Sequence, residues 1–263
     1  MQTRNHVAVV IPAYNEADAL PPFLAEIRTA FDEIGTPVTL IVIDDASTDG
    51  TGAAAAPFAD VVRAPRNRGH GPTALAAYVE GLRVGANVIV HVDGDGQFFG
   101  ADIARVALAL DGLNVDLVHG VRRGRKDPWF RRTLSALVRC AVFVLCGRSV
   151  PDVNTPLRAY RREVLERLVA ELPEEVLVPH VHFSITEARD RLRVRYVSVA
   201  SIPRRSAEAQ GTMWGAGRTR RVLPPTRLVR FAARALRELW SLDVLGRSRR
   251  GSSFARSGAP MRG

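Results

Sequence analysis

The sequence is poor in cysteine and in long apolar runs, and each shortage excludes a class of protein. Cys140 and Cys146 are the only cysteines in 263 residues. They stand six positions apart within one expected helix, too far apart for a disulfide, so we expect reduced thiols in a cytosolic protein. No stretch reaches the roughly 18 apolar residues that a membrane-spanning helix needs, and no signal peptide is expected. The chain should be soluble or lie on a surface.

Lysine is almost absent, and acidic residues are outnumbered. Lys126 is the only lysine among 37 basic residues, so arginine carries the net charge of +10. Two explanations stay open: a compositional bias toward Arg and Ala, and attraction to phosphates, acidic lipid surfaces or nucleic acid. The chain after Arg218 is dense in Arg and nearly free of acid, so its charge cannot be neutralised locally.

The chain does contain a regular alternation of short apolar runs and amphipathic segments. The expected strands are 7–11, 38–43, 61–62, 88–92, 115–119 and 194–199, and the expected helices are 19–34, 72–85, 102–110, 129–146 and 180–191. Between them we expect a basic loop over 122–128, a turn over 152–156 and a mobile loop over 203–217. This alternation predicts an α/β fold, with a mostly parallel sheet and helices on both faces.

The basic end of the chain is expected to form a separate part. Residues 1–217 should form the α/β domain, 218–245 a basic amphipathic helical segment, and 246–263 a disordered tail. Within 227–242 the apolar residues recur at helical spacing, with arginines on the opposite face. Such a helix suits an anionic membrane surface, although packing on the domain or on a dimer partner stays open.

Polar clusters follow three of the expected strands. They are Asn15 and Glu16 after the first, Asp44 and Asp45 after the second, and Asp93 and Asp95 after the fourth. Ligands of open α/β sheets bind at the carboxyl ends of strands. We therefore expect these side chains to gather at one edge of the sheet.

The segment Asp93-Gly94-Asp95-Gly96-Gln97 has the chemistry of a metal site. Two carboxylates and an amide oxygen suit Mg²⁺ or Mn²⁺, with diphosphate oxygens completing the shell. A metal there would neutralise the charge that grows on a leaving nucleoside diphosphate. Taken alone, such a segment is more often an acidic surface turn. Its place beside the other acidic strand ends favours the metal site.

The glycine pattern of dinucleotide-binding oxidoreductases is missing. That pattern, Gly-x-Gly-x-x-Gly, follows the first strand, whereas here the first strand ends in Pro12-Ala-Tyr-Asn-Glu16. Gly69-His-Gly71 follows the third strand and lacks a third glycine. The sequence therefore disfavours an oxidoreductase.

Four motifs in order resemble family 2 glycosyltransferases of the GT-A fold, and above all the dolichyl- or polyprenyl-phosphate mannose or glucose synthases. They are Val9-Val-Ile-Pro-Ala-Tyr-Asn-Glu16, Ile43-Asp-Asp-Ala-Ser-Thr-Asp-Gly-Thr51, Asn67-Arg-Gly-His-Gly71 and Val92-Asp-Gly-Asp-Gly-Gln97. The resemblance is strong over 6–125 and continues to about 217. It implies inverting transfer of a sugar from a donor such as GDP-mannose or UDP-glucose, with Mg²⁺ or Mn²⁺ as cofactor.

The resemblance also implies roles for matching positions. At the nucleotide-sugar site it places Pro12, Ala13, Tyr14, Glu16, Ile43, Asp45, Asp93, Gly94 and Arg205, and as metal ligands Asp93, Asp95 and Gln97. The expected catalytic set is Asp95, Asp152, Arg122, Arg131 and Arg132. The arginines in that set would bind phosphate, which suits the planar guanidinium.

The acceptor stays open between two chemistries. A lipid phosphate is already anionic and needs no general base, whereas a hydroxyl needs one, for which Asp152 is the candidate. Capping of the following turn is the alternative role for Asp152. We expect a polyprenyl or dolichyl phosphate first, and a hydroxyl of a glycan or natural product second. A non-catalytic binder is last, and nucleic acid is disfavoured because no aromatic-basic RNA motif is present.

The sequence also departs from the family pattern. Asp152-Val-Asn-Thr-Pro-Leu157 replaces the usual Asp-x-x-Ser-Gly-Phe, and Trp214 stands where a lysine is usual. The transmembrane helices of some relatives are missing. We expect a cytoplasmic protein that lies peripherally on the membrane.

Overall fold

The computed structural model describes most of the chain and divides it into two units. The described residues are 6–110, 114–123, 136, 143, 147, 150–153, 155–200, 202–205 and 226–245. The first unit is Met1–Arg218 and the second is Thr219–Gly263. Four expectations lie wholly or almost wholly outside the described residues: the helix over 129–146, Arg131 with Arg132, the loop beyond 205, and the tail from 246.

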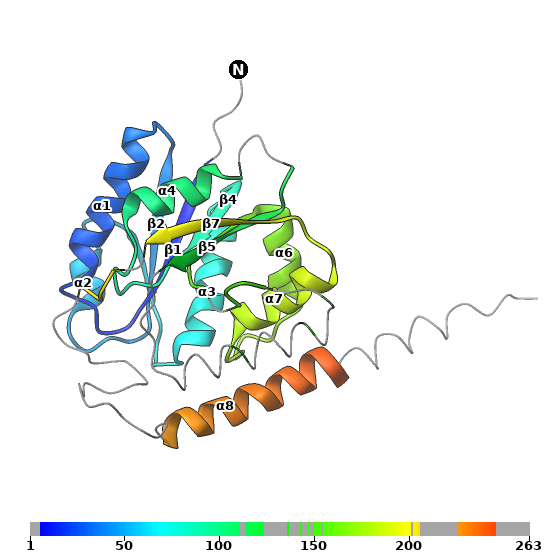
Figure 1. Cartoon of the computed structure of the whole chain (residues 1–263). Coiled ribbons are helices and arrows are strands. Elements are labelled where there is room, and N and C mark those ends of the chain that lie inside the picture. Colours follow the sequence, from blue (N-terminus) through cyan, green and yellow to red (C-terminus); the bar gives the residue numbers. More distant parts are fainter. Residues whose placement is uncertain are drawn as a thin grey trace, which may run out of the picture. The chain divides into compact units, whose positions relative to one another are not determined.

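The described part of the first unit is built on one sheet (Figure 1). Its strands are β1 Val7–Ala13, β2 Val38–Asp44, β3 Asp60–Arg63, β4 Val88–His91, β5 Leu117–Arg123, β6 Arg158–Arg161 and β7 Val194–Ala200. Their order is β3-β2-β1-β4-β6-β5-β7. All neighbours are parallel except β6, which runs antiparallel to β4 and to β5. The expected mostly parallel sheet is confirmed.

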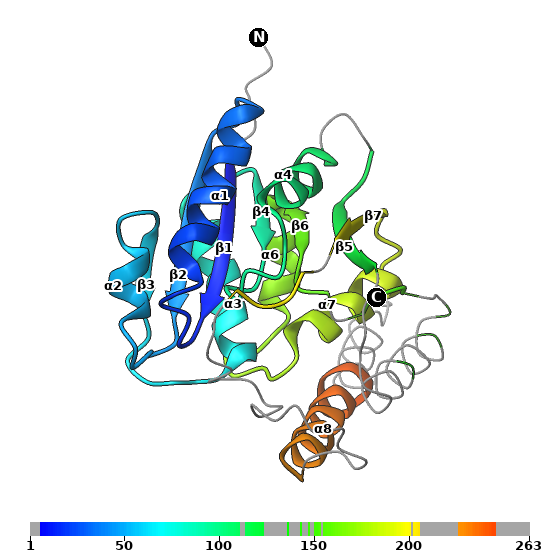
Figure 2. The same ribbon diagram turned by 60° about the vertical axis from the view of Figure 1, so that its left-hand side comes forward.

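Helices cover both faces of this sheet, as Figures 1 and 2 show. The helices are α1 Leu20–Glu33, α2 Thr51–Ala55, α3 His70–Arg83, α4 Gly100–Leu108, α6 Arg162–Ala170 and α7 Pro179–Arg189. Because side chains alternate along a strand, β1 supplies both cores. Val9 and Ile11 pack with α1 and α4 on one face, and Ala8 and Val10 pack with α3, α6 and α7 on the other.

Two features of the sheet differ from the sequence expectation. The strand β6 was not expected, because its four residues begin and end with Arg and lack a strand pattern. The basic loop was expected to begin at Arg122, which is wrong: β5 continues to Arg123. The reason is pairing with β7, which matches Arg122 with Val199 and Arg123 with Ala200. Arg122 is therefore held on a strand.

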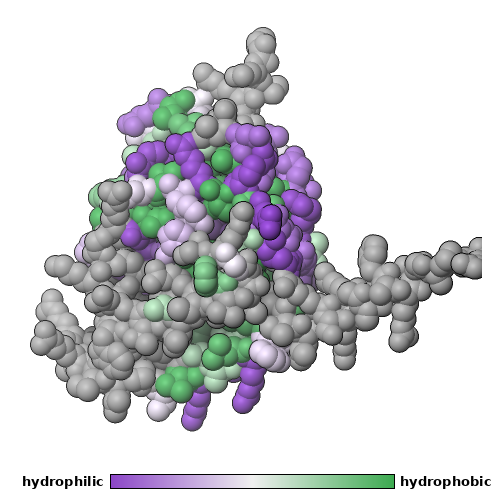
Figure 3. Space-filling model, turned by 45° about the vertical axis from the view of Figure 1, so that its right-hand side comes forward, coloured by the Kyte–Doolittle hydropathy of each residue, from purple (hydrophilic) through white to green (hydrophobic). Residues whose placement is uncertain are grey.

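The described part of the second unit is helical. It consists of α8, Thr226–Leu239, followed by a π-helical turn over Trp240–Leu245. Among the described residues of the whole chain, no helix is both long enough and apolar enough to cross a bilayer. On the face drawn in Figure 3, hydrophilic side chains surround smaller hydrophobic areas.

Candidate functional site

The carboxyl ends of β1, β2 and β4 meet at one edge of the sheet. In register, Pro12 pairs with Ile43 and Ala13 with Asp44. Beyond the strands, the Asp45 amide donates to the Ala13 carbonyl (2.9 Å), and the Gly94 amide donates to the Pro12 carbonyl (3.2 Å). The three acidic clusters are therefore neighbours, as expected, and Tyr14 and Glu16 follow directly from β1.

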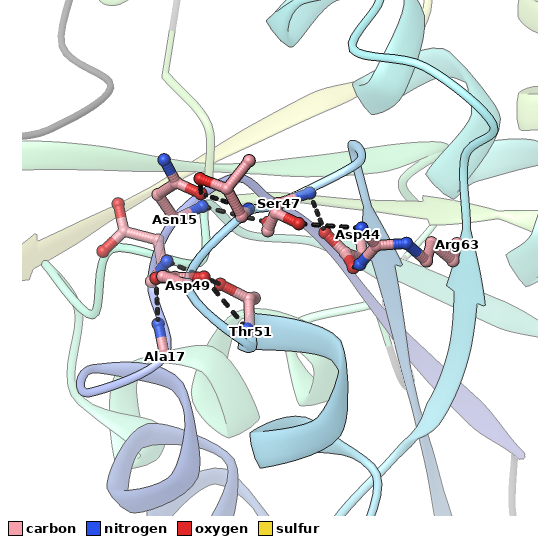
Figure 4. Close-up of polar contacts among 9 residues, drawn as sticks. Asn15, Ala17, Asp44, Ser47, Asp49, Thr51 and Arg63 are labelled. Atoms are coloured by element: carbon pink, nitrogen blue, oxygen red, sulfur yellow. Dashed lines mark hydrogen bonds and ion pairs between the residues drawn. The ribbon is translucent and has the colours of Figure 1, made fainter.

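The turn after β1 is tied to the loop after β2 (Figure 4). The Asn15 amide donates to Ser47 Oγ (3.0 Å), and Asn15 Oδ1 accepts the Thr48 amide (2.9 Å). Asn15 has a φ of 55°, in the left-handed region that Asn tolerates better than most residues. These contacts give Asn15 and Ser47 a structural role at the base of the site.

Asp49 makes the second tie between these two loops. Its Oδ2 accepts the Ala17 amide (3.1 Å) and its Oδ1 accepts the Thr51 amide (3.0 Å). Burial opposes the charged form, but the hydrogen bonds from Thr51 and Ala17 prevail and lower the pKa of Asp49. Thr51 Oγ1 in turn accepts the Glu16 amide (2.9 Å). The motif 43–51 therefore fixes the backbone that carries Glu16.

Asp45 joins the end of β2 to the loop before α3. Its two oxygens accept the amides of Arg68 (2.8 Å) and Gly69 (2.9 Å), and its side chain is only 2% exposed. Ile43 is equally buried, in the core beneath α3. These contacts are structural, and the expected contact of Asp45 and Ile43 with a nucleotide stays a prediction.

The loop after β4 holds two acidic side chains close together. Burial, reinforced by the charge of Asp93, raises the pKa of Asp95 to about 7. Asp93 Oδ1 is buried and accepts no hydrogen bond from the described residues, while His70 Nε2 lies 3.8 Å away. Two crowded carboxylates with an unsatisfied oxygen are an arrangement that a divalent cation would stabilise.

The protein supplies only part of a metal shell at this loop. Across the described ranges, no group of three or more His, Cys, Asp or Glu side chains is placed to hold a metal. Gln97, the third expected ligand, directs its side-chain amide nitrogen toward the Ile202 carbonyl (3.5 Å). A cation bound by Asp93 and Asp95 would need further oxygens from a ligand such as a diphosphate, which fits the donor set that the sequence predicts.

Arg204 is a site residue that the sequence analysis missed. Its guanidinium donates to Glu16 Oε1, and its Nε lies 3.4 Å from Asp95 Oδ2. It therefore stands between the acidic groups that follow β1 and β4. The sequence contains two adjacent arginines, Arg204 and Arg205, but it does not show which of them faces the carboxylates.

Arg205, the arginine expected at the donor site, binds the back of the same loop. It donates to the carbonyls of Gly96 (2.9 Å) and Phe98 (3.2 Å) and pairs with Glu26 on α1 (2.5 Å). Gly96 has a φ of 67°, and a Cβ there would stand 2.7 Å from Arg205 Cδ. Its contacts give Arg205 a supporting position, and its expected role in donor binding stays a prediction.

Arg122, near the end of β5, is directly paired with Asp152. Arg122 Nε and Nη2 donate to Asp152 Oδ2 at 3.2 and 3.1 Å. Their side chains are 11% and 16% exposed, so the pair is largely shielded from solvent. The structure thus brings together one expected phosphate-binding arginine and the candidate base.

With this geometry in view, comparison with known proteins decides the family. The model of "Glycosyl transferase family 2" matches residues 8–169, which is more than half of the chain. The chain belongs to glycosyl transferase family 2. The matched stretch contains every acidic strand end and the Arg122–Asp152 pair, whereas Arg204 lies beyond it.

Two relatives are about one third identical to this chain over the residues that align. "Undecaprenyl-phosphate 4-deoxy-4-formamido-L-arabinose transferase" of Aeromonas hydrophila is 32% identical over 201 residues, covering 74% of this chain and 60% of the relative. "Polyprenol monophosphomannose synthase" of Mycolicibacterium smegmatis is 35% identical over 172 residues, covering 61% and 63%. The chain thus spans less than two thirds of the length of these relatives.

Solved structures support the fold. Glucosyl-3-phosphoglycerate synthase from Mycobacterium tuberculosis superimposes with a TM-score of 0.62 over 90% of this chain and 79% of that one, at 21% identity. The same enzyme is also known in complex with Mn²⁺, UDP-glucose and glycerol 3-phosphate. The likeness establishes the GT-A fold of this family 2 domain.

Beneath the acidic loop lies a histidine cluster that the sequence did not reveal. His91 is fully buried and stacks on Tyr78 (4.9 Å between ring centroids), and its Nδ1 donates to the Pro156 carbonyl (2.7 Å). Burial lowers the pKa of His91 to about 4, which keeps the ring neutral. His180 Nε2 lies 3.1 Å from the Tyr78 hydroxyl. The only signal was a histidine at the end of an apolar strand.

Proposed function

We propose that this chain transfers a sugar from a nucleoside-diphosphate donor to a polyprenyl or dolichyl phosphate, with inversion at the anomeric carbon. The observation that carries the proposal is the crowded pair Asp93 and Asp95 at the carboxyl end of β4, beside Arg204. Membership of family 2 and the printed names of the relatives support both the reaction class and the acceptor.

The donor side of the proposed site lies along the ends of β1 and β4. Asp93 and Asp95 would hold Mg²⁺ or Mn²⁺, which when bound supplies positive charge beside the leaving diphosphate. Pro12, Ala13, Tyr14 and Glu16 would line the nucleotide. Arg204 is within reach of the same region, and a guanidinium binds phosphate oxygens in a planar, two-pronged way.

The acceptor side is proposed to lie at the end of β5. Arg122 would hold the lipid phosphate, and the resemblance gives Arg131 and Arg132 the same role. That phosphate already carries the attacking negative oxygen, so no side chain has to remove a proton. Catalysis would then consist of positioning and charge stabilisation.

A hydroxyl acceptor is the second candidate, because Asp152 lies where an acceptor bound to Arg122 would meet a carboxylate. A hydroxyl would have to lose its proton to Asp152 as it attacks. In the resting structure Asp152 Oδ2 is engaged with Arg122 Nε and Nη2. This pairing favours a lipid phosphate as the acceptor, because phosphate oxygens can replace Asp152 as the partner of the Arg122 guanidinium.

A lipid acceptor lies in a membrane, so an enzyme that uses it has to bind at the membrane surface. We propose that the protein lies peripherally on the cytoplasmic face, held by the basic helix α8. The support is sequence order along that helix, where Arg230, Arg234 and Arg237 fall on one face. Basic amphipathic helices of this kind bind anionic lipid surfaces.

One experiment tests both the reaction and the acceptor. The protein is incubated with GDP-mannose or UDP-glucose and with either a polyprenyl phosphate or an acceptor that offers a sugar hydroxyl. The products are identified by mass. EDTA should stop turnover, Mg²⁺ or Mn²⁺ should restore it, and Asp95→Ala should abolish it in a protein that remains folded. If Asp95→Ala retains activity, or if EDTA has no effect on turnover, the metal assignment is wrong.

The variant Asp152→Asn separates the two acceptors. Transfer to a lipid phosphate should survive this change to within about tenfold, whereas transfer to a hydroxyl should fall by about 10²-fold or more, because the base is lost. Donor binding without turnover on any acceptor would favour a non-catalytic binder instead. A gel shift at physiological salt checks nucleic acid.

A further inference from the structure

A fully buried ionic cluster lies between β5, β6 and α7. Arg158 and His119 are 0% exposed, and Glu187 is 2% exposed. Arg158 Nη1 lies 3.4 Å from Glu187 Oε1, and His119 Nε2 lies 3.2 Å from Glu187 Oε2. Tyr160 also donates to Glu187 Oε1 (2.8 Å). Burial opposes the charge of Glu187, but its cationic and hydrogen-bonding neighbours lower its pKa.

Stability alone is a weak reason for such a cluster. The desolvation cost of a buried ion pair often exceeds its attraction, and apolar replacements are frequently as stable. The Arg158 guanidinium carries five N–H donors in one plane, so it can hold several acceptors at fixed positions. The acceptors that it bonds therefore identify the segment that it holds in place.

Those donors reach the loop before β6. Arg158 Nε donates to the Thr155 carbonyl (2.9 Å), and Nη2 donates to the Val153 carbonyl (2.7 Å) and to Ser184 Oγ (3.0 Å). Ser184, on α7, also donates to the Val153 carbonyl (3.3 Å). One guanidinium thus holds the carbonyls one and three residues after Asp152.

The same loop is fixed to β5 from its other side. Thr155 Oγ1 donates to the Gly120 carbonyl (2.6 Å), and the Gly120 amide donates to the Leu157 carbonyl (2.8 Å). Gly120 lies two residues before Arg122 on β5. The position of Asp152 relative to Arg122 is therefore set by Arg158 from beneath and by β5 from the side.

We propose that Arg158, held in place by Glu187, is a positioning residue for the acceptor side of the site, because it fixes the loop that presents Asp152 to Arg122. The proposal rests on the function proposed above insofar as Arg122 and Asp152 meet the acceptor. Arg158 itself touches no substrate, since it is buried. It acts through the Val153 and Thr155 carbonyls.

The structural arm of the test is hydrogen–deuterium exchange in three variants. Glu187→Gln removes the charge that holds Arg158, and Ser184→Ala is the milder change if the first fails to fold. Ile27→Val, in the core on the opposite face, is the control for general destabilisation. We expect exchange in the peptide covering 150–160 to rise about tenfold in Glu187→Gln, and less in Ser184→Ala. Exchange in the peptide covering 38–49 should not change, because β2 pairs with β1 and β3 and makes no pairing with β6.

The kinetic arm separates the acceptor from the donor. In Glu187→Gln the KM for polyprenyl phosphate should rise about tenfold, while the KM for the donor and the Kd for UDP with Mn²⁺ stay within about twofold. If the KM values for donor and acceptor rise together, in step with those of Ile27→Val, Arg158 is merely structural and the proposal is wrong.

The two arms also separate the failure of this proposal from the failure of the proposed function. If wild-type protein transfers no sugar to any acceptor, the proposed function fails, and exchange still decides whether Arg158 holds the loop. Unchanged exchange at 150–160 in both Glu187→Gln and Ser184→Ala overturns the proposal, whatever the activity.

Discussion

At the residue scale, two adjacent arginines serve opposite sides of one loop. Arg204 faces Glu16 and Asp95, whereas Arg205 turns to Glu26 and to the carbonyls of the acidic loop. Neighbours in an extended segment point in opposite directions, so the two arginines cannot both face the carboxylates, and the resemblance pointed to Arg205 alone. Which one does so depends on the register of the segment against the loop, set by the Ile202 amide donating to the Gln97 carbonyl (3.1 Å).

Arg204→Ala and Arg205→Ala should therefore have different consequences. Arg204→Ala should raise the KM for the donor by about tenfold, because a charge-assisted contact with phosphate is lost. Arg205→Ala should lower the free energy of unfolding by about 1–3 kcal/mol, because two loop carbonyls and Glu26 lose their donor. Steady-state kinetics and urea unfolding of both variants make the comparison. Equal effects on the donor KM would contradict these assignments.

Buried histidines give the protein an acid limit. Burial, with the charge of Arg158 adding to it, lowers the pKa of His180 well below 6.5. The unfolded chain takes up a proton near pH 6.5 and the folded chain does not, so this stability is present above pH 6.5 and is lost as pH falls toward the folded pKa. His91, with a pKa of about 4, acts in the same direction.

We expect these histidines to lower the free energy of unfolding between pH 7.5 and pH 5, as measured by urea denaturation, against the opposite effect of Asp95, whose pKa is raised to about 7. The variant His180→Gln, which keeps a polar partner for the Tyr78 hydroxyl, should lose less stability than wild type over this range. An unchanged slope in His180→Gln would mean that other groups set the acid limit.

At the element scale, helices and strands with a repeating apolar pattern could be predicted from the sequence. Strands whose extent depends on pairing with a neighbouring strand could not. The strands β1, β2 and β4 and the helices α1, α3 and α4 follow from apolar periodicity, and so does the gathering of acidic groups at the strand ends. The strand β6 did not follow, because its residues are ordered by pairing with β4 and β5 on both sides. The end of β5 also depended on its partner, β7.

A glycine inside α3 shows how the helix is seated on the sheet. A Cβ at Gly81 would stand 2.8 Å from Val10 Cγ1 and 2.9 Å from Ile89 Cγ2. Gly81→Ala gains about 1 kcal/mol of helix propensity but overpacks this contact, at a cost of about 1–3 kcal/mol. The net result should be a protein less stable by up to about 2 kcal/mol in urea unfolding. Val79→Ala, on the exposed side of α3, is the control and should be near neutral; a stabilised Gly81→Ala would contradict the close seating.

At the scale of the whole molecule, the charge is concentrated in one unit. From Thr219 onward the chain has eleven arginines against Glu238 and Asp243, which is +9 of the total +10. The first unit, which carries the candidate site, is therefore nearly neutral overall. The sequence analysis expected this concentration of charge after Arg218, so the second unit is the part of the chain in which attraction to anions should be tested.

Three arginines of α8 lie on one side of the helix. At 100° per residue, Arg230, Arg234 and Arg237 fall within one quarter of the helix circumference, and Ala232, Leu236 and Leu239 fall opposite them. A helix with this division can place its apolar face among acyl chains while its arginines meet anionic headgroups. Each such arginine near an anionic surface contributes about 1 kcal/mol, and salt screens the contribution.

The double variant Arg230→Glu/Arg234→Glu should therefore lose at least about tenfold in partitioning onto phosphatidylglycerol vesicles, measured by sedimentation at low salt. Deletion of 220–263 should release the protein entirely. Arg83→Glu/Arg167→Glu makes the same change of net charge on exposed helical positions of the first unit, and should stay within about twofold of wild type. Equal losses in both double variants would mean that net charge alone drives binding. Undiminished binding of the deleted chain would move the membrane contact to the first unit, where Arg122 and its neighbours would have to supply it.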